Sequence, residues 1–474
     1  MTTGDPRQLV ESIFSLSLEQ DTDQYERYLY TPLSKATNEI RLVTLLPTSC
    51  GDAIHITISH YRLIAPTAAH APKRLLLQEI RKTLPPNWSA YETNEGPIIF
   101  WYSHNGNRKV SWTHPNPCIP HDSYSIPSSE AKAAAEPRYE ALSYTWGPAG
   151  GQETALVVET DDTSAEHKPH CLPIGQSLAS AIRHLRLPDR PRVFWIDAIC
   201  INQDDHRERS EQVRRMGEIF SNADCVIAWL GRSSGTSRLA MSTMAHLGSR
   251  IVVSKDSFVL PHPDCADSEM AWHDMNRKLP YDEATWSAIQ DLWQRQWFER
   301  MWVVQEIQLA NSKSIIQCGH DIVPWPRFRD AVIHLSSGRT GTPKSFNAAA
   351  YNVWSLCDGV RDATLEILLL RTATRKCSDD RDRIYGILSI APPWLGRELV
   401  PDCALSLMDV YKTVFLLHTR NTTRISLLPF LQSSATPNWP TWVPDFRSKS
   451  RLFEGLQLHA FCASSVSGAV ERFD

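Results

Sequence analysis

A tryptophan and a glutamate four residues apart, Trp302 and Glu306, form the pattern that points most directly to chemistry. Residues i and i+4 share one face of a helix, so a helix here places the carboxylate beside the indole ring, with Leu309 on the same stripe. An apolar neighbour keeps water from a carboxylate, which raises its pKa and suits it to a catalytic role. The alternative is an ordinary helix glutamate, partly exposed and paired with Arg300 or another cation.

Four more side chains stand where predicted strands end. Ser143 and Trp146 lie at or just after the end of the strand-like run YEALSYTW, and Asp197 and Asn202 follow the apolar run RVFWI. Open α/β sheets bind ligands at the carboxyl ends of their parallel strands, so these residues are candidate ligand contacts. Asp197 is ambiguous, because a buried acid at a strand end must in any case find partners.

Other acidic clusters have a structural explanation. Helix capping accounts for Asp204, Asp205 and Glu208, which precede or begin a helical stretch. A helix start with local ion pairs accounts for the run from Asp379 to Arg383. No metal site is predicted, since His262 and Cys265 lie close together without a second pair of ligands. The chain also lacks a phosphate loop, a GxGxxG after a strand and HExxH.

The elements that must position these residues alternate between strand and helix from Tyr139 onward. The largely apolar runs YEALSYTW, RVFWIDAIC and CVIAWLG indicate strands, and helical periodicity separates them over 174–185 and 213–220. Such strands indicate an α/β fold with a parallel sheet covered on both faces. Further helices are predicted over 286–310, 362–372, 380–391 and 405–419. Nearer the N-terminus, a helix precedes two strand-like runs, Glu39–Leu46 and Ala53–Ile64.

Composition excludes several classes of protein. The 474 residues are 42% hydrophobic and 22% charged, with a net charge of −4, which is typical of a soluble globular chain and argues against a nucleic-acid binder. The longest apolar runs fall far short of the ~20 residues that span a bilayer, so no membrane association is expected. The first residues do not resemble a secretory signal. Eleven scattered cysteines favour a reducing, cytoplasmic location with buried thiols.

The aromatic block at 84–115 resembles a WW domain in the order of its conserved residue types. The matching residues are Leu84, Pro85, Trp88, Phe100, Trp101, His104, Trp112 and Pro115. The resemblance implies that Trp88 and Pro115 close the fold. It also implies a groove for a proline-rich peptide or protein partner, lined by Phe100, Tyr102, His104 and Trp112. The alternative is an aromatic hairpin that only packs on its neighbour. A linker rich in Pro, Ser and Ala is expected over 116–137.

The chain from Tyr139 to about residue 445 resembles the fungal heterokaryon incompatibility (HET) domain. The similarity rests on YEALSYTWG, LPIGQSLASAIRHLR, FWIDAICINQDDHRERSEQVRRMGEIFSNADCVIAWLG, RMWVVQEIQLA, SDDRDRIYGILSI, PDCALSLMDVY and WVPDF, in that order. Residues 1–66 resemble the lead-in strands of such proteins. The resemblance implies a role in self/non-self recognition after fungal cells fuse, with cell death as the outcome.

HET domains are regarded as distant relatives of TIR domains, and this relation implies a chemistry. Leu142-Ser143-Tyr144 and Phe194–Asp197 are similar to the first two TIR strands, and Glu306 matches the glutamate of TIR enzymes that cleave NAD. The resemblance therefore implies a TIR-like core over 139–310, extended by a helical and loop-rich region over 311–474. The resemblance implies that NAD is the substrate, that no cofactor is required and that Glu306 is the catalytic residue. It also implies that Trp302 forms a wall of the NAD pocket, whose other residues are Ser143, Trp146, Asp197 and Asn202. The competing hypothesis is a non-enzymatic signalling module that forms homo-oligomers and recruits proline-rich partners.

Overall fold

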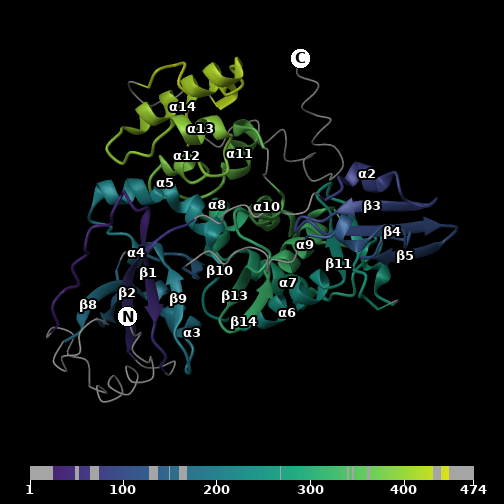
Figure 1. Cartoon of the computed structure of the whole chain (residues 1–474), viewed down its shortest axis with the longest axis horizontal. Coiled ribbons are helices and arrows are strands. Elements are labelled where there is room, and N and C mark those ends of the chain that lie inside the picture. The colour runs from purple at the N-terminus through teal and green to yellow at the C-terminus, as the bar shows by residue number, and fades with distance from the viewer. Residues whose placement is uncertain are drawn as a thin grey trace.

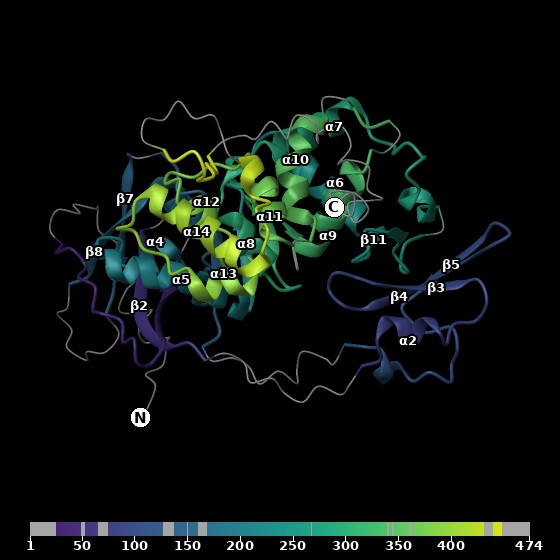
Figure 2. The same ribbon diagram turned by 90° about the horizontal axis from the view of Figure 1, so that it is seen from above.

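The computed structural model describes residues 25–447, apart from 49–52, 65–73, 127–136, 149, 160–167, 267, 339–340, 344–345, 360–362 and 431–438. A nine-stranded sheet, in the order β14-β13-β10-β6-β9-β1-β2-β7-β8, forms the centre of the fold. Helices pack on the sheet, and a group of C-terminal helices lies beyond one end of its strands (Figures 1 and 2). A small three-stranded sheet lies at one end of the molecule. The helix expected at the N-terminus lies outside the described residues.

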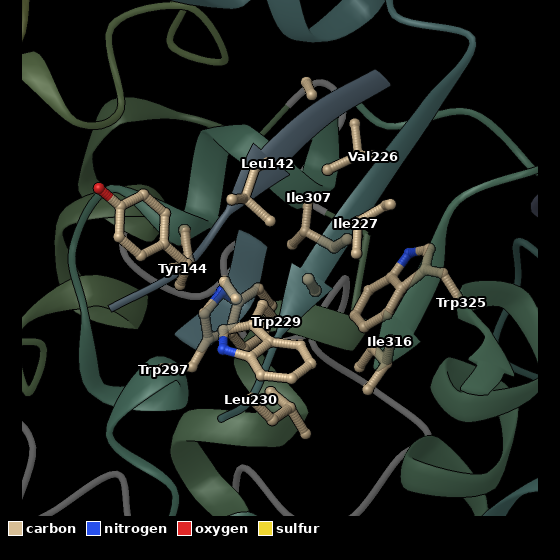
Figure 3. Close-up of a cluster of buried hydrophobic side chains, with 14 of the residues drawn as sticks. Leu142, Tyr144, Val226, Ile227, Trp229, Leu230, Trp297, Ile307, Ile316 and Trp325 are labelled. Atoms are coloured by element: carbon tan, nitrogen blue, oxygen red, sulfur yellow. The ribbon is translucent and has the colours of Figure 1, made fainter. Parts of the chain in front are cut away.

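The middle of the large sheet is parallel, as the apolar strand runs predict. Its strands are β9 (Arg192–Trp195), β6 (Glu140–Ser143), β10 (Cys225–Trp229) and β13 (Ile315–Cys318). Leu142, Ile227 and Ile316 from three of these strands belong to one buried cluster that also holds Ile307 (Figure 3). Strands buried on both faces carry continuous apolar runs, which is why β6, β9 and β10 could be recognised in the sequence, whereas β13 was not predicted.

The sheet as a whole is mixed, which differs from the purely parallel sheet that was predicted. Two lead-in strands, β1 (Glu39–Leu45) and β2 (Ile54–Arg62), pair antiparallel, and β1 continues the sheet antiparallel to β9. The outer strands are β7 (Gln152–Val157), β8 (His170–Gly175) and β14 (Asp321–Pro324). The N-terminal segment is therefore part of the central sheet.

Amphipathic helices cover the two faces of the sheet. They are α3 (Gln176–Leu185), α4 (Asp197–Cys200), α5 (His206–Asn222), α6 (Ser237–Gly248), α7 (Glu283–Trp293), α8 (Val303–Gln308), α9 (Trp325–Ser336) and α10 (Phe346–Cys357). Asp205 caps α5 by accepting the N–H groups of Arg207 and Glu208, as predicted. The helix predicted over 286–310 is interrupted, because Trp297 and Phe298 turn into the core between α7 and α8.

The C-terminal helices build a second hydrophobic core. They are α11 (Leu365–Thr372), α12 (Asp382–Tyr385), α13 (Pro393–Glu398) and α14 (Leu407–Thr422), and we call them the C-terminal lobe. The lobe lies over α4, α5 and α8, on the side of the sheet where the parallel strands end (Figures 1 and 2). No helix in the described part of the chain has the length and apolar character needed to cross a bilayer.

The aromatic block forms an antiparallel sheet of β3 (Trp88–Glu92), β4 (Ile98–His104) and β5 (Asn107–Ser111). Its core also includes Ile80 of α2 (Leu77–Arg81) and Tyr124, so the unit, here called the β3–β5 module, extends beyond the predicted limits of 84 and 115 on both sides. A helix and a 3-10 turn thus flank the three strands. Part of the predicted linker is therefore ordered as core of this module.

The predicted peptide groove does not form, because its residues point to opposite faces. Phe100 pairs with Ser111, so Phe100 and Trp112 project to opposite sides of the sheet. Phe100 is fully buried against Tyr124, and Trp112 packs beside His262. Tyr102 and His104 share the face of Phe100, and the ring of Tyr102 contacts Trp88.

The Trp112 face of the module instead packs on the rest of the chain. Ile99, Trp101 and Trp112 contact the hairpin of β11 (Ile251–Val253) and β12 (Val259–Pro261). The Lys255 N–H donates to the Glu92 carbonyl at 2.8 Å, which ties the two sheets together at their edges. This face therefore agrees with the alternative expectation, in which the aromatic hairpin packs on its neighbour.

Candidate functional site

Ser143 and Glu306 meet where β6 ends. Ser143 is the last residue of that strand, and its hydroxyl donates a hydrogen bond to the Glu306 carboxylate on α8. The Trp297 indole N–H donates to the Ser143 hydroxyl oxygen at 2.9 Å. Ser143 is 1% exposed and Glu306 3%, so this chain of hydrogen bonds lies inside the protein.

Burial makes the Glu306 carboxyl a weaker acid than an ordinary glutamate. Loss of water raises the pKa of its carboxyl from 4.5 to about 7, against the opposing effects of the Arg300 guanidinium and the Ser143 hydroxyl. The nearby Asp197 carboxylate adds to the increase. Near neutral pH this group therefore exists in both protonation states, which is the property required of a general acid or base.

Asp197 is the second carboxyl of the site. It is the first residue of α4, just beyond the end of β9, and it is only half-buried. Its carboxylate accepts hydrogen bonds from the Trp146 indole N–H at 3.0 Å, from the Ala198 N–H at 2.7 Å and from the Tyr144 hydroxyl. Burial raises its pKa, and Arg300 opposes that increase. Since Trp146 is 46% exposed, this side of the site reaches the surface.

Arg300 is the cation between the two carboxylates. Its positive charge favours the ionised form of both Asp197 and Glu306, and its guanidinium donates to the carbonyl of Tyr144. The backbone of the same segment pairs with the C-terminal lobe, where the Met301 N–H donates to the Lys376 carbonyl at 2.9 Å. The position of Arg300 is thus fixed from both sides.

The structure brings Ser143, Trp146, Asp197 and Glu306 together and places the other two predicted residues elsewhere. Trp302 precedes α8, and its indole N–H donates to Asp382 of α12 at 3.0 Å, so its ring packs toward the C-terminal lobe. Asn202 accepts the Asp204 N–H at 3.2 Å in the turn that leads to α5. The indole of Trp302 is thus bound to the C-terminal lobe, and its role as a wall of an NAD pocket stays a prediction.

Three residues of the site were not recognised from the sequence in these roles. Tyr144 directly follows Ser143, and Trp297 lies three residues before Arg300, but no spacing rule brings these segments together. Arg300 was considered only as a surface partner of Glu306. The one available signal was the density of aromatic residues around both segments.

The arrangement combines acid–base groups with charge stabilisation. Two carboxyls of raised pKa, one guanidinium and two indole N–H groups converge at the carboxyl edge of a parallel sheet, where α/β folds bind ligands. The run Asp379–Arg383 forms local ion pairs, Arg381 with Asp379 and Arg383 with Asp380. Within the described ranges, no three His, Cys, Asp or Glu side chains are grouped to hold a metal ion.

One protein-family model matches the region of the chain that holds this site. Residues 139–306 match the family model described as heterokaryon incompatibility protein (HET), and this stretch contains Ser143, Asp197, Arg300 and Glu306. The chain is 28% identical over 326 residues to heterokaryon incompatibility protein 6, OR allele, of Neurospora crassa. That similarity covers 59% of this chain and 46% of the relative, so the chain spans less than half of that protein's length. No solved structure matches.

Proposed function

We propose that this chain acts in fungal heterokaryon incompatibility, and that its HET region kills the fused cell by cleaving NAD. The observation that carries the enzymatic part is the contact of Ser143 with a buried Glu306 whose pKa is raised to about 7. The printed name of the Neurospora relative and the HET match support the biological role. The convergence of Glu306 with Asp197 and Arg300 supports the chemistry.

The reaction needs only the groups present and water. The bond between nicotinamide N1 and ribose C1′ breaks, and its electron pair leaves with nicotinamide. Ionised Glu306 stabilises the positive charge that develops on the ribose. A water oxygen then bonds to C1′, and its proton passes to Asp197, the more exposed of the two carboxyls. The products are nicotinamide and ADP-ribose.

Substrate access requires a movement, because Glu306 is 3% exposed. Tyr144 and Arg300 lie near it, and the segment of Arg300 is tied to the C-terminal lobe through Lys376 and Asp382. We assign activation to a shift of this lobe when copies of the chain associate. The resting protein is then inactive, as a protein that kills its own cell must be.

A non-enzymatic signalling module is the second candidate. The burial of the Ser143–Glu306 pair favours it, because a fully enclosed hydrogen bond also stabilises an interior. In that case the HET region self-associates and signals through surfaces of the C-terminal lobe or of the β3–β5 module. Binding of a proline-rich partner is not part of this proposal, because the four predicted groove residues do not share one face of the β3–β5 module.

Release of nicotinamide separates the two candidates. We expect the purified full-length chain, concentrated or forced to oligomerise, to release nicotinamide from NAD as followed by chromatography. Glu306→Gln should lower the rate at least a hundredfold, because a neutral amide cannot stabilise the developing cation.

The matched control is Glu283→Gln, which changes an exposed carboxylate in the first turn of α7. Its rate should stay within about threefold of the parent. No nicotinamide from the parent, also when oligomerised, would leave the signalling module as the function.

A further inference from the structure

A groove lies between α5 and the loop Val400–Ala404, away from the residues of the site described above. Its volume is about 830 Å³, within the range of roughly 300–1,000 Å³ typical of small-molecule sites. One wall is the face of α5 that carries His206, Arg207, Ser210, Glu211 and Arg214. These positions follow the i, i+3, i+4, i+7 spacing, so a single helix face is turned toward the groove.

Two arginines on that wall make no hydrogen bond or ion pair through their guanidinium groups in the described part of the chain, although the charge of Arg207 acts on the nearby Asp205 carboxylate. Arg207 and Arg214 are exposed, and neither guanidinium contacts an acceptor within the described ranges of the chain. Seven residues of helix separate them, which places them about 10 Å apart along the axis. Unpaired guanidinium groups at the rim of one groove favour an anionic ligand.

The acidic residues of the groove are already engaged. Glu211 pairs with Lys35 at 2.8 Å, and Asp402 accepts the Ala404 N–H at 2.8 Å. The first N–H groups of α5 are also occupied, because Asp205 accepts those of Arg207 and Glu208. The side chains of Arg207, Arg214, His206 and Lys35 therefore keep donors for a ligand.

The opposite wall is largely apolar. Val400, Pro401, Cys403 and Ala404 form it, and Val400 leaves 53% of its surface open to solvent. The wall is held in place where the Arg381 guanidinium donates to the Leu405 carbonyl at 2.8 Å and where the Cys403 N–H reaches the Ser210 hydroxyl at 3.5 Å. The groove is thus a fixed slot with cations on one side and hydrocarbon on the other.

We propose that this groove binds a nucleotide, with the phosphates on Arg207 and Arg214 and the base against Val400 and Pro401. A flat apolar ring joined to a chain of phosphates matches both walls in character and the slot in size. This site is separate from Glu306 and does not depend on NAD cleavage. It joins α5 of the HET region to the C-terminal lobe, so its ligand contacts both.

Titration of the full-length chain with ATP by calorimetry tests the proposal. We expect ATP to bind, and Arg207→Gln and Arg214→Gln each to weaken it about tenfold, as loss of a charge-assisted hydrogen bond does. Val400→Asn, which adds no charge, should weaken ATP but leave inorganic tripolyphosphate unchanged. Because all three positions lie at the surface, these variants are expected to fold.

Two controls make the outcome specific. Arg424→Gln removes an exposed arginine elsewhere on the chain and should leave ATP binding unchanged, as should Glu306→Gln. Absence of ATP binding, or equal binding by the Arg207, Arg214 and Arg424 variants, would overturn the proposal. If tripolyphosphate bound as tightly as ATP, the assignment of the ligand as a nucleotide would be wrong. The same would follow if the chain bound an oligo-glutamate peptide but not ATP. Loss of ATP binding in Glu306→Gln alone would move the ligand to the other site.

Discussion

Arg329→Met is expected to destabilise the protein by about 3–5 kcal/mol, the usual cost of removing one partner from a buried ion pair. Arg329 of α9 donates to both oxygens of Glu95, at 2.6 and 3.1 Å, and to Asp330 at 2.7 Å. Asp330 in turn accepts the N–H of Val253 in β11 at 3.1 Å. Without the guanidinium, two carboxylates would face each other in a mostly buried position. Urea unfolding would measure the loss.

Arg327→Met is the matched control, because Arg327 lies two residues away on the same helix and its side chain is exposed. It should change the unfolding free energy by less than about 0.5 kcal/mol. Hydrogen exchange adds a local measurement, since the Arg329 variant should lose protection in β3–β5 and β11 before the central sheet does. Equal stability of the two variants would mean that Glu95 and Arg329 form an ordinary surface pair.

This ion cluster explains how the β3–β5 module is held to the rest of the fold. Glu95 lies between β3 and β4, and Arg329 connects it to α9, while Ile99 and Trp101 of β4 pack on Val252 and Leu260. The apolar contact and the ion pair act on the same face of the module. A face buried in this way is unavailable to an outside peptide as long as the module stays docked.

Local sequence patterns were sufficient where one element determines its own structure. The periodicity of 174–185 predicted α3, and the cap at Asp205 predicted the start of α5. Apolar runs predicted β6, β9 and β10, because strands buried on both faces need no partner information to be recognised. The strands β13 and β14 were not predicted, because each holds an apolar run of only two residues, Ile315–Ile316 and Ile322–Val323.

Long-range pairing could not be predicted in the same way. The position of β1 beside β9 joins Val43 to Phe194, and no local pattern carries that pairing. In the β3–β5 module the order of aromatic residues matched a WW domain, but strand register decides the faces, and the Phe100–Ser111 pair separates Phe100 from Trp112. In the candidate site, Ser143 and Asp197 could be predicted because strand ends converge at one edge of a parallel sheet. Trp297 could not, since it reaches Ser143 from an irregular turn.

The Glu306 carboxyl is expected to make the stability of the protein fall as pH rises. Its pKa lies at about 7 in the folded chain against 4.5 ordinarily, so the folded state holds the proton more tightly. Below pH 4.5 the group is protonated in both states, and its favourable contribution is complete. Between 4.5 and 7 only the unfolded chain ionises, and above 7 about 3 kcal/mol has been lost. Unfolding of the parent and of Glu306→Gln at pH 5 and pH 8 measures this contribution.

The comparison must be made between proteins, because burial also raises the pKa of Asp330 and of Asp382, each to about 6. Their effects are present in both chains and cancel in the difference. Glu306→Gln keeps an oxygen that can accept from Ser143 and should therefore be the more stable protein at pH 8, while the two approach each other at pH 5. Parallel stability curves would show instead that Arg300 keeps Glu306 ionised throughout.

The effects of Glu306→Gln on stability and on nicotinamide release, taken together, separate a catalytic glutamate from a structural one. If Glu306 only holds α8 to β6, an uncharged glutamine performs the same task, and Glu306→Gln changes stability without removing an activity. If Glu306 stabilises a cation during NAD cleavage, Glu306→Gln gains stability and loses nicotinamide release together, which is the trade-off typical of functional groups held in unfavourable surroundings. A variant that is less stable at pH 8 and also inactive would contradict this assignment, because loss of folding would then explain loss of activity.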